Sequence, residues 1–410
     1  MENQVTPFTS ATKTNRVYSV DFLRGVVMMI MLLDHTRDFI HWGGFLFDPT
    51  DLSKTYPALF FTRWITHYCA PTFVFLSGVS IYLQRLAGKS NSELSRFLWT
   101  RGLWLIFLEF TVVRFGFTFN FTFSFLGAPQ VIWVIGVSMI VMAALIYAPV
   151  KWVGVFGLLM IVLHNLLDVF ALPPQAAFGG QIQIDSLRAV WLVLHQQGFI
   201  SFGGPTMMIL YPLIPWVGVM AAGWAFGAIY SWEPEQRRKW LFGAGIAAIF
   251  LFVVIRLINI YGDPQQWAQQ ENGIYTVLSF LNTTKYPPSL LFLLMTLGPS
   301  ITLLALTDGI DGKTIWQRVC ITFGRVPMFY YILQWFVAHG LALLLSLIAG
   351  KDTSYLLTNP GSGVQPPPDA GFSLWVVYAA CIGGLIILYP LCLWWGNLKR
   401  RNKHWLLSYL

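Results

Sequence analysis

Seven ionisable side chains within one apolar stretch are the part of this 410-residue chain best suited to chemistry. An ionisable group at the centre of a bilayer costs roughly 2.5–3.5 kcal/mol even on a lenient insertion scale, so it must face protein, water or an opposite charge. By default such groups mark a functional pathway. In residues 19–41 they are Asp21, Arg24, Asp34, His35, Arg37, Asp38 and His41.

Helical spacing places three of these side chains along one face. With a rotation of about 100° per residue and Arg24 as the reference, His35 falls about 20° and Asp38 about 40° away, whereas Arg37 falls about 140° away. His35 lies about 16 Å further along the axis than Arg24. Because His35 and Asp38 are three residues apart, the carboxylate can orient the imidazole, and we predict both as catalytic residues.

A purely structural interpretation of the same stretch competes with this one. Asp21 with Arg24, and Asp34 with Arg37, can form local ion pairs that make insertion tolerable. Residues 25–33 between the two pairs are uncharged, so each pair can also extend toward a membrane interface. On this interpretation the charges serve folding alone.

The second apolar stretch, residues 58–84, contains two more candidates. Arg63 and His67 are one helical turn apart, and Pro71 predicts a kink just beyond them. A single intramembrane histidine is more often a packing residue, yet His67 is a further candidate for catalysis. We predict Arg63, together with Asp34 and His41, as contacts to a substrate.

Other stretches add charged residues of two kinds. Glu109 and Arg114 could be a buried pair or part of the same polar interior. Several arginines fall near the inner ends of their stretches, where an anionic cofactor would first meet the protein. We predict cofactor binding by Arg24, Arg96, Arg101 and Arg325.

The composition indicates the elements that position these residues. The chain is 56% hydrophobic and 11% charged, with a mean hydropathy of +0.61, whereas soluble domains are about 25% charged. We predict an all-α, polytopic membrane protein that forms one domain over residues 1–410, because helices satisfy their own backbone groups in lipid. About ten spans are expected, at residues 19–41, 58–84, 97–119, 129–149, 151–171, 206–231, 239–261, 288–307, 319–349 and 374–396.

The distribution of Lys and Arg predicts the orientation of these spans. With the N-terminus inside, the inner segments and helix ends contain seventeen basic residues and the outer loops four. The positive-inside rule therefore places both termini in the cytoplasm. The short loops favour a bacterial inner membrane, with lipid as the surroundings; a homodimer is left open.

Several function classes lack their usual motifs. The chain has no Walker loop, no G-x-G-x-x-G, no G-x-S-x-G and no H-E-x-x-H. Its basic residues are spread over six segments, which argues against nucleic-acid binding, and its four cysteines show no metal-binding spacing, so we expect no metal. A histidine–carboxylate pair with basic residues at the cytoplasmic mouth suits transfer of a group from a phosphorylated donor.

The motifs also resemble a known family. The pattern R-x₃-V-D-F-L-R-G-x₅-M-x₃-H, from Arg16 to His35, resembles the first helix of transmembrane acyltransferases. It is most similar to bacterial relatives of the heparan-alpha-glucosaminide N-acetyltransferase catalytic domain. Further similar segments occur in the family's order at residues 63–78, 211–227, 285–299 and 324–334, so the resemblance covers residues 16–349.

The resemblance implies a transmembrane acyltransferase with acetyl-CoA as the cytoplasmic donor and a sugar-type acceptor on the far side. It also implies an active histidine in or near the membrane, and His35 follows Arg24 at the spacing found in related acyltransferases. His35 would either remove a proton from the acceptor or transiently take the acyl group.

Two other functions stay open at this point. The same Asp/His/Arg chain could act as the proton relay of a proton-coupled transporter or exporter. A non-catalytic membrane scaffold would tolerate the loss of every polar residue in the first stretch.

Overall fold

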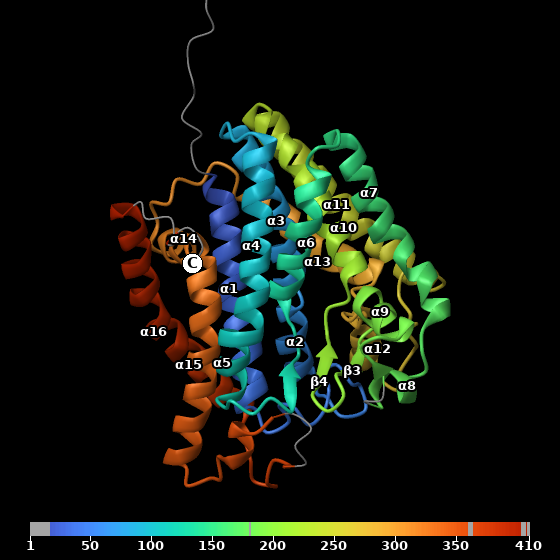
Figure 1. Cartoon of the computed structure of the whole chain (residues 1–410), viewed down its shortest axis with the longest axis vertical. Helices are drawn as coiled ribbons and strands as arrows, with labels where there is room; N and C mark the ends of the chain where they lie inside the picture. Colours follow the sequence, from blue (N-terminus) through green and yellow to red (C-terminus); the bar gives the residue numbers. More distant parts are fainter. Residues whose placement is uncertain (1–16, 180–181, 360–363, 403–406, 408–410) are drawn as a thin grey trace, which may run out of the picture.

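Helix α1 (Tyr18–Ile40) lies at the centre of a bundle of roughly aligned helices (Figure 1). The structure is a computed structural model that describes residues 17–179, 182–359, 364–402 and 407. Arg16, at the start of the family pattern, lies outside the described residues. Helix α1 packs against α2 (Pro57–Thr66), α3 (Cys69–Leu86), α13 (Leu290–Leu306), α14 (Ile315–Arg325), α15 (Pro327–Ile348) and α16 (Leu374–Arg401).

The other helices lie around this group. We call the end at which α1 begins the upper end and the opposite end the lower end, as drawn in Figure 1. The remaining α-helices are α4 (Asn91–Leu108), α5 (Arg114–Thr118), α6 (Val131–Leu145), α7 (Val150–Leu163), α8 (Pro174–Phe178), α9 (Leu187–Leu194), α10 (Leu213–Phe226), α11 (Pro234–Ile258) and α12 (Gly273–Leu281). Short π- or 3₁₀-helical turns are η1 (Glu109–Val113), η2 (His164–Phe170), η3 (Gly227–Ser231) and η4 (Ser354–Leu357).

Each of the ten predicted stretches is mainly helical. Within the described residues, five helices are long and apolar enough to cross a membrane: Val150–Phe170, Leu213–Ser231, Pro234–Ile258, Pro327–Ile348 and Leu374–Arg401. Helices α6 and α13 are apolar but shorter, and α1 carries too many charges to qualify by composition. The chain is therefore an integral membrane protein, whereas ten crossings and their orientation stay predictions.

Proline breaks two of the predicted stretches. A proline removes one helical hydrogen bond and its ring clashes with the carbonyl four residues earlier. Pro71 accordingly separates α2 from α3 at His67 and Tyr68, as the predicted kink requires. Pro327 begins α15 directly after α14 ends, so α14 takes a different direction from α15 (Figure 1).

Glycines allow the helices around the site to touch backbone to backbone. A Cβ atom at Gly25 of α1 would lie 1.8 Å from the carbonyl oxygen of Cys320, and one at Gly324 of α14 would lie 1.8 Å from that of Asp21. Small residues permit such close crossings between membrane helices. Because Arg24 and Arg325 are the chain neighbours of these glycines, the crossing also brings the two arginines to one region.

A small sheet corrects the all-α prediction. Strands β1 (Phe125–Gly127), β4 (Thr206–Ile209), β3 (Gly198–Ser201) and β2 (Ile182–Gln183) lie side by side in that order near the lower end (Figure 1). Strands β3 and β4 are antiparallel, and the other two pairs are parallel. We predicted residues 206–209 as the start of a membrane span. They form strand β4 instead, and the helix α10 begins only at Leu213.

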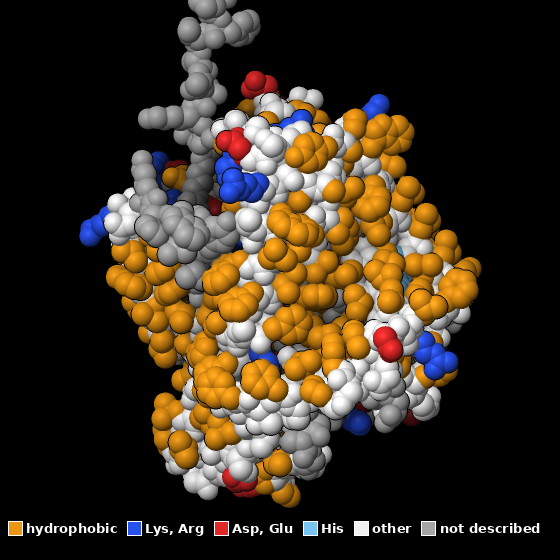
Figure 2. Space-filling model, in the orientation of Figure 1, with side chains coloured by type: hydrophobic (Ala, Val, Ile, Leu, Met, Phe, Trp, Pro, Cys, Tyr) orange, Lys and Arg blue, Asp and Glu red, His pale blue; other side chains and the backbone are white. Residues whose placement is uncertain are grey.

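The surface agrees with a membrane location. Figure 2 shows apolar side chains over the middle of the visible face and charged side chains mainly near the upper end and in the lower third. Exposed apolar residues are frequent on the long helices, for example Phe250 of α11 at 65% and Ile386 of α16 at 68%. Such contiguous apolar cover suits contact with lipid.

Candidate active site

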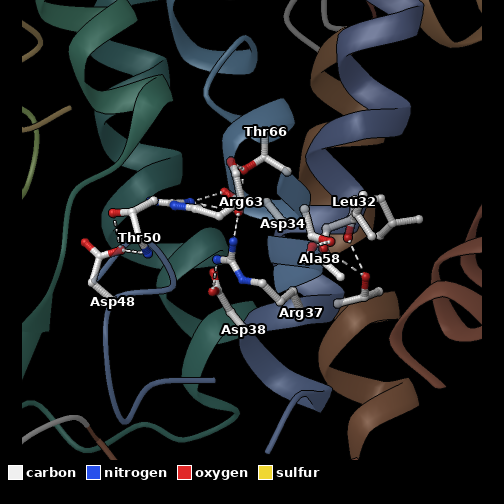
Figure 3. Close-up of polar contacts among 12 residues, drawn as sticks. Leu32, Asp34, Arg37, Asp38, Asp48, Thr50, Ala58, Arg63 and Thr66 are labelled. Carbon is white, nitrogen blue, oxygen red and sulfur yellow. Dashed lines mark hydrogen bonds and ion pairs between the residues drawn. The ribbon is translucent and has the colours of Figure 1, made fainter. Parts of the chain in front are cut away.

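Asp34 is the centre of a buried charge network (Figure 3). Arg63 of α2 donates to both carboxylate oxygens of Asp34 at 2.8 Å, and the Thr66 hydroxyl donates to Oδ1 at 2.8 Å. The Arg37 guanidinium lies 2.9 Å from the same oxygen and reaches Asp38 with its other nitrogen. The Arg37 side chain is only 2% exposed, so its charge depends on these two carboxylates.

His35 is held by a ring contact. Its imidazole lies against the indole of Trp335 of α15, with ring centroids 3.7 Å apart. Its Nδ1 is buried without a hydrogen-bond partner among the described residues. Asp38, which we predicted to orient this imidazole, instead pairs with Arg37.

His35 and all members of the network except Arg37 line one cavity of about 290 Å³, which we call the lower cavity. Helices α1 and α2 contribute Asp34, His35, Asp38 and Arg63, and the small sheet contributes Phe125 and Met208. The cavity therefore combines carboxylates, cations and aromatic rings, the kind of lining that binds a polar molecule with apolar ring faces. Its remaining polar or aromatic lining includes Phe45, Thr66, Phe117, Gln130, Tyr211, Lys285, Tyr286 and Tyr331.

A second cavity, of about 610 Å³, lies toward the upper end, and we call it the upper cavity. Much of its lining is apolar, from α3, α4, α6 and α15. Five basic residues lie among the others, namely Arg24, Arg101, Arg325, Lys89 and Lys399. Its size is that of a typical pocket for a cofactor-sized molecule, and its charge favours an anion.

The basic residues of the upper cavity are positioned by specific contacts. Arg24 donates to Ser80 Oγ at 2.7 Å and to the carbonyl oxygen of Gly324 at 3.2 Å, besides its ion pair with Asp21 at 3.2 Å. Arg325 lies over the Tyr18 ring, at 5.5 Å from its centroid.

The two cavities share a wall. Val131, the first residue of α6, and Tyr331 of α15 line both of them. Along α1, Arg24 lines the upper cavity and His35 the lower one. The two residues predicted to share a face of α1 thus line different cavities, which have Val131 and Tyr331 in common.

Three predicted site residues lie elsewhere. His67 packs against Phe292 of α13, at 5.3 Å between rings, and is absent from the lining of either cavity. His41 ends α1, where its Nδ1 accepts from the Gly43 backbone at 3.0 Å and its Nε2 lies 3.3 Å from the Tyr56 hydroxyl. Arg96 is exposed on α4, outside the upper cavity.

Glu109 and Arg114 do not form the buried pair that was one of the two alternatives for them. Arg114 donates to the backbone carbonyls of Phe125, Thr122 and Asn120, so it closes the loop before the sheet. One carboxylate oxygen of Glu109 has no partner among the described residues. Glu109 begins the π-helical turn η1, a feature often found near functional sites.

Several residues that line the cavities were not predicted from the sequence. Lys285 and Tyr331 fell within motifs that were recognised, but nothing in their spacing distinguished them from packing residues. Lys89 and Lys399 are among the basic residues predicted for the inner side, but their positions predict no role in a site. The strand residues of the lower cavity belong to segments that were predicted as helix or loop.

Fold and site together define a helical membrane protein with a basic cavity adjoining a cavity that holds carboxylates and an imidazole. The sequence profile of the family described as "Heparan-alpha-glucosaminide N-acetyltransferase, catalytic" matches residues 16–261, more than half of the chain. The protein belongs to this catalytic-domain family, which indicates an acyltransferase. No curated protein matches the chain.

Proposed function

We propose that this protein transfers an acetyl or other acyl group from cytoplasmic acyl-CoA in the upper cavity to a sugar-type acceptor in the lower cavity. The observation that carries the proposal is the shared wall between a basic cavity and a cavity containing His35. The family supports an acyltransferase in general. The positive-inside count supports a cytoplasmic upper end.

The upper cavity suits the donor in its chemistry. Phosphate groups are bound by arginine and lysine through charge-assisted hydrogen bonds, and Arg24, Arg101 and Arg325 provide these donors. Apolar residues such as Ile135 and Met139 provide a surface for the uncharged arm of coenzyme A. The thioester would then lie at the end of the cavity nearest to Val131 and Tyr331.

The lower cavity suits the acceptor and the transfer step. In direct transfer, the acceptor amine or hydroxyl attacks the thioester carbonyl carbon while His35 takes its proton. The carbon–sulfur bond breaks, and the coenzyme A thiolate leaves and takes that proton from the imidazolium. A two-step route uses the same geometry, with His35 itself first carrying the acyl group.

The test is transfer from labelled acetyl-CoA to glucosamine by protein purified in detergent. We expect His35→Ala to lower kcat by at least about 100-fold, since a positioned base contributes roughly 10²–10⁴-fold. His67→Ala is the matched control, because His67 is a buried histidine outside both cavities. Wild-type activity in the His35 variant, with both variants folded, would refute the assignment.

A further inference from the structure

Two adjacent tyrosines of α15 are buried in different ways. Tyr330 is 0% exposed, and its hydroxyl donates to the carbonyl oxygen of Met28 at 2.8 Å. This hydrogen bond fixes α15 against α1, which is an ordinary structural role. Tyr331 is 4% exposed, and its hydroxyl makes no hydrogen bond of ordinary geometry among the described residues, with the Trp335 side chain as its nearest polar contact.

Burying a hydroxyl without a partner costs about 1–3 kcal/mol, so such a group in a folded protein calls for an explanation. Tyr331 lines both the upper and the lower cavity, a position that it shares with Val131. Of these two residues, only Tyr331 has a side chain that can donate a hydrogen bond. In the proposed function, the acyl group moves from donor to acceptor across the wall that these two residues form.

The surroundings of Tyr331 connect it to His35. Tyr331 and Trp335 are four residues apart on α15, hence on one face, with ring centroids 6.4 Å apart. Trp335 in turn contacts the His35 ring, with the two ring planes tilted by 44°. Two successive turns of α15 therefore carry the Tyr331 hydroxyl and the ring that contacts His35.

We propose that the Tyr331 hydroxyl donates a hydrogen bond to the carbonyl oxygen of the acyl-CoA thioester and stabilises the oxyanion that forms there on attack. This role rests on the proposed acyl transfer and holds for both the direct and the two-step route. When the acceptor or His35 attacks the carbonyl carbon, the oxygen gains negative charge, and the charge returns to form the C=O bond as the thiolate leaves. A donor already in place at that oxygen lowers the barrier because it need not reorganise.

Tyr331→Phe tests the proposal, because it removes the hydroxyl and keeps the ring in the wall. We expect kcat for transfer to glucosamine to fall by about 10²–10³-fold, with the KM values for acetyl-CoA and glucosamine unchanged within about twofold. Tyr330→Phe is the matched control: we expect a lower Tm, from loss of the bond to Met28, and a normal kcat. A wild-type kcat in Tyr331→Phe would overturn the proposal.

A second measurement separates this inference from the proposed function. The infrared carbonyl stretch of bound acetyl-CoA, labelled with ¹³C at the carbonyl, reports a hydrogen bond to that oxygen without any turnover. We expect a lower frequency in the wild type and in Tyr330→Phe than in Tyr331→Phe. Equal frequencies in all three proteins would overturn the role of Tyr331 even if transfer occurs. A Tyr331-dependent shift without transfer to any acceptor would support the contact and count against the proposed function.

Discussion

Asp34 is the residue on which the charges of the lower cavity depend. It accepts from Arg63 and Thr66 and pairs with Arg37, whose second partner is Asp38. Removing one partner of a buried ion pair is far more costly than the pair itself is stabilising, because a charge is left uncompensated. Asp34 therefore positions the charged residues of the lower cavity. This structural role is independent of any contact between Asp34 and a substrate.

Asp34→Asn leaves two buried guanidinium groups with one carboxylate. We expect the free energy of unfolding to fall by about 3–5 kcal/mol, measured by thermal or denaturant unfolding in detergent. Asp51→Asn is the control, since Asp51 lies in a loop and its ion pair with Lys54 is exposed, at 3.6 Å. Equal free energies of unfolding for the two variants would contradict the stabilising role of Asp34 in the network.

Substitution of Arg325 tests how the protein recognises the acyl donor, acetyl-CoA. It lines the upper cavity, whereas Arg96 is exposed outside it. We expect Arg325→Gln to raise the KM for acetyl-CoA about tenfold or more, as for loss of a hydrogen bond to a charged group. Arg96→Gln should leave it unchanged. The KM for S-acetyl-N-acetylcysteamine, a thioester without phosphates, should not change in either variant; a rise there for Arg325→Gln would argue against phosphate binding.

The residue contacts were predictable where the partners share a helix. Asp21 with Arg24, and Asp34 with Arg37, form the ion pairs expected from their spacing. Arg37 also pairs with Asp38, which its position on the helical wheel did not predict, because a long side chain carries its charge several ångströms from the Cα atom. Tyr331 and Lys285 could not be identified, since their exposure to a cavity depends on helices distant in sequence.

At the scale of elements, the crossing of α1 and α14 sets the geometry of the upper cavity. The crossing needs glycine at Gly25 and Gly324, because each helix places a backbone carbonyl where a Cβ would be. The adjacent residues Arg24 and Arg325 then line one cavity. The R-G and G-R pairs of the sequence motifs thus have one physical explanation.

Gly25→Ala tests this crossing. A methyl group 1.8 Å from the Cys320 carbonyl oxygen forces the helices apart, and we expect a loss of about 3 kcal/mol or more of unfolding free energy, with weaker binding of acetyl-CoA. Gly243→Ala on α11 is the control. Nothing lies within 4 Å of a Cβ there, so this change should stabilise by about 0.5–1 kcal/mol through helix propensity. A Gly25 variant as stable as wild type would show that the close crossing is not required.

The helices were largely predictable as elements and the sheet was not. Ten long apolar stretches, two of them broken by proline, predict the helices. This prediction does not depend on which segments pack against them. The strands are two to four residues long and pair across the chain, as β1 does with β4, so they show no periodicity of their own. The fold class thus follows from the sequence, whereas the part of the lower cavity formed by the sheet does not.

At the scale of the whole molecule, the proposed transfer requires that the two cavities serve opposite sides of the membrane. The starts of α1, α4 and α11 and the end of α3 gather at the upper end, where the basic residues predict the cytoplasm (Figure 1).

Single cysteines test this orientation. The four native cysteines are all buried, so background labelling should be low. We expect a membrane-impermeant maleimide to label Lys54→Cys in intact cells and Ser92→Cys only after permeabilisation, since both positions are exposed and lie on opposite sides in the proposed topology. The reverse pattern would invert the topology.

The most direct test of the central claim is transfer across a sealed membrane. Purified protein is reconstituted into liposomes that contain glucosamine, and labelled acetyl-CoA, which cannot cross the bilayer, is added outside. We predict labelled N-acetylglucosamine inside the vesicles with wild-type protein and none with His35→Ala. Absence of product inside, when the same protein acetylates glucosamine in detergent, would contradict a route from the upper cavity to the lower one.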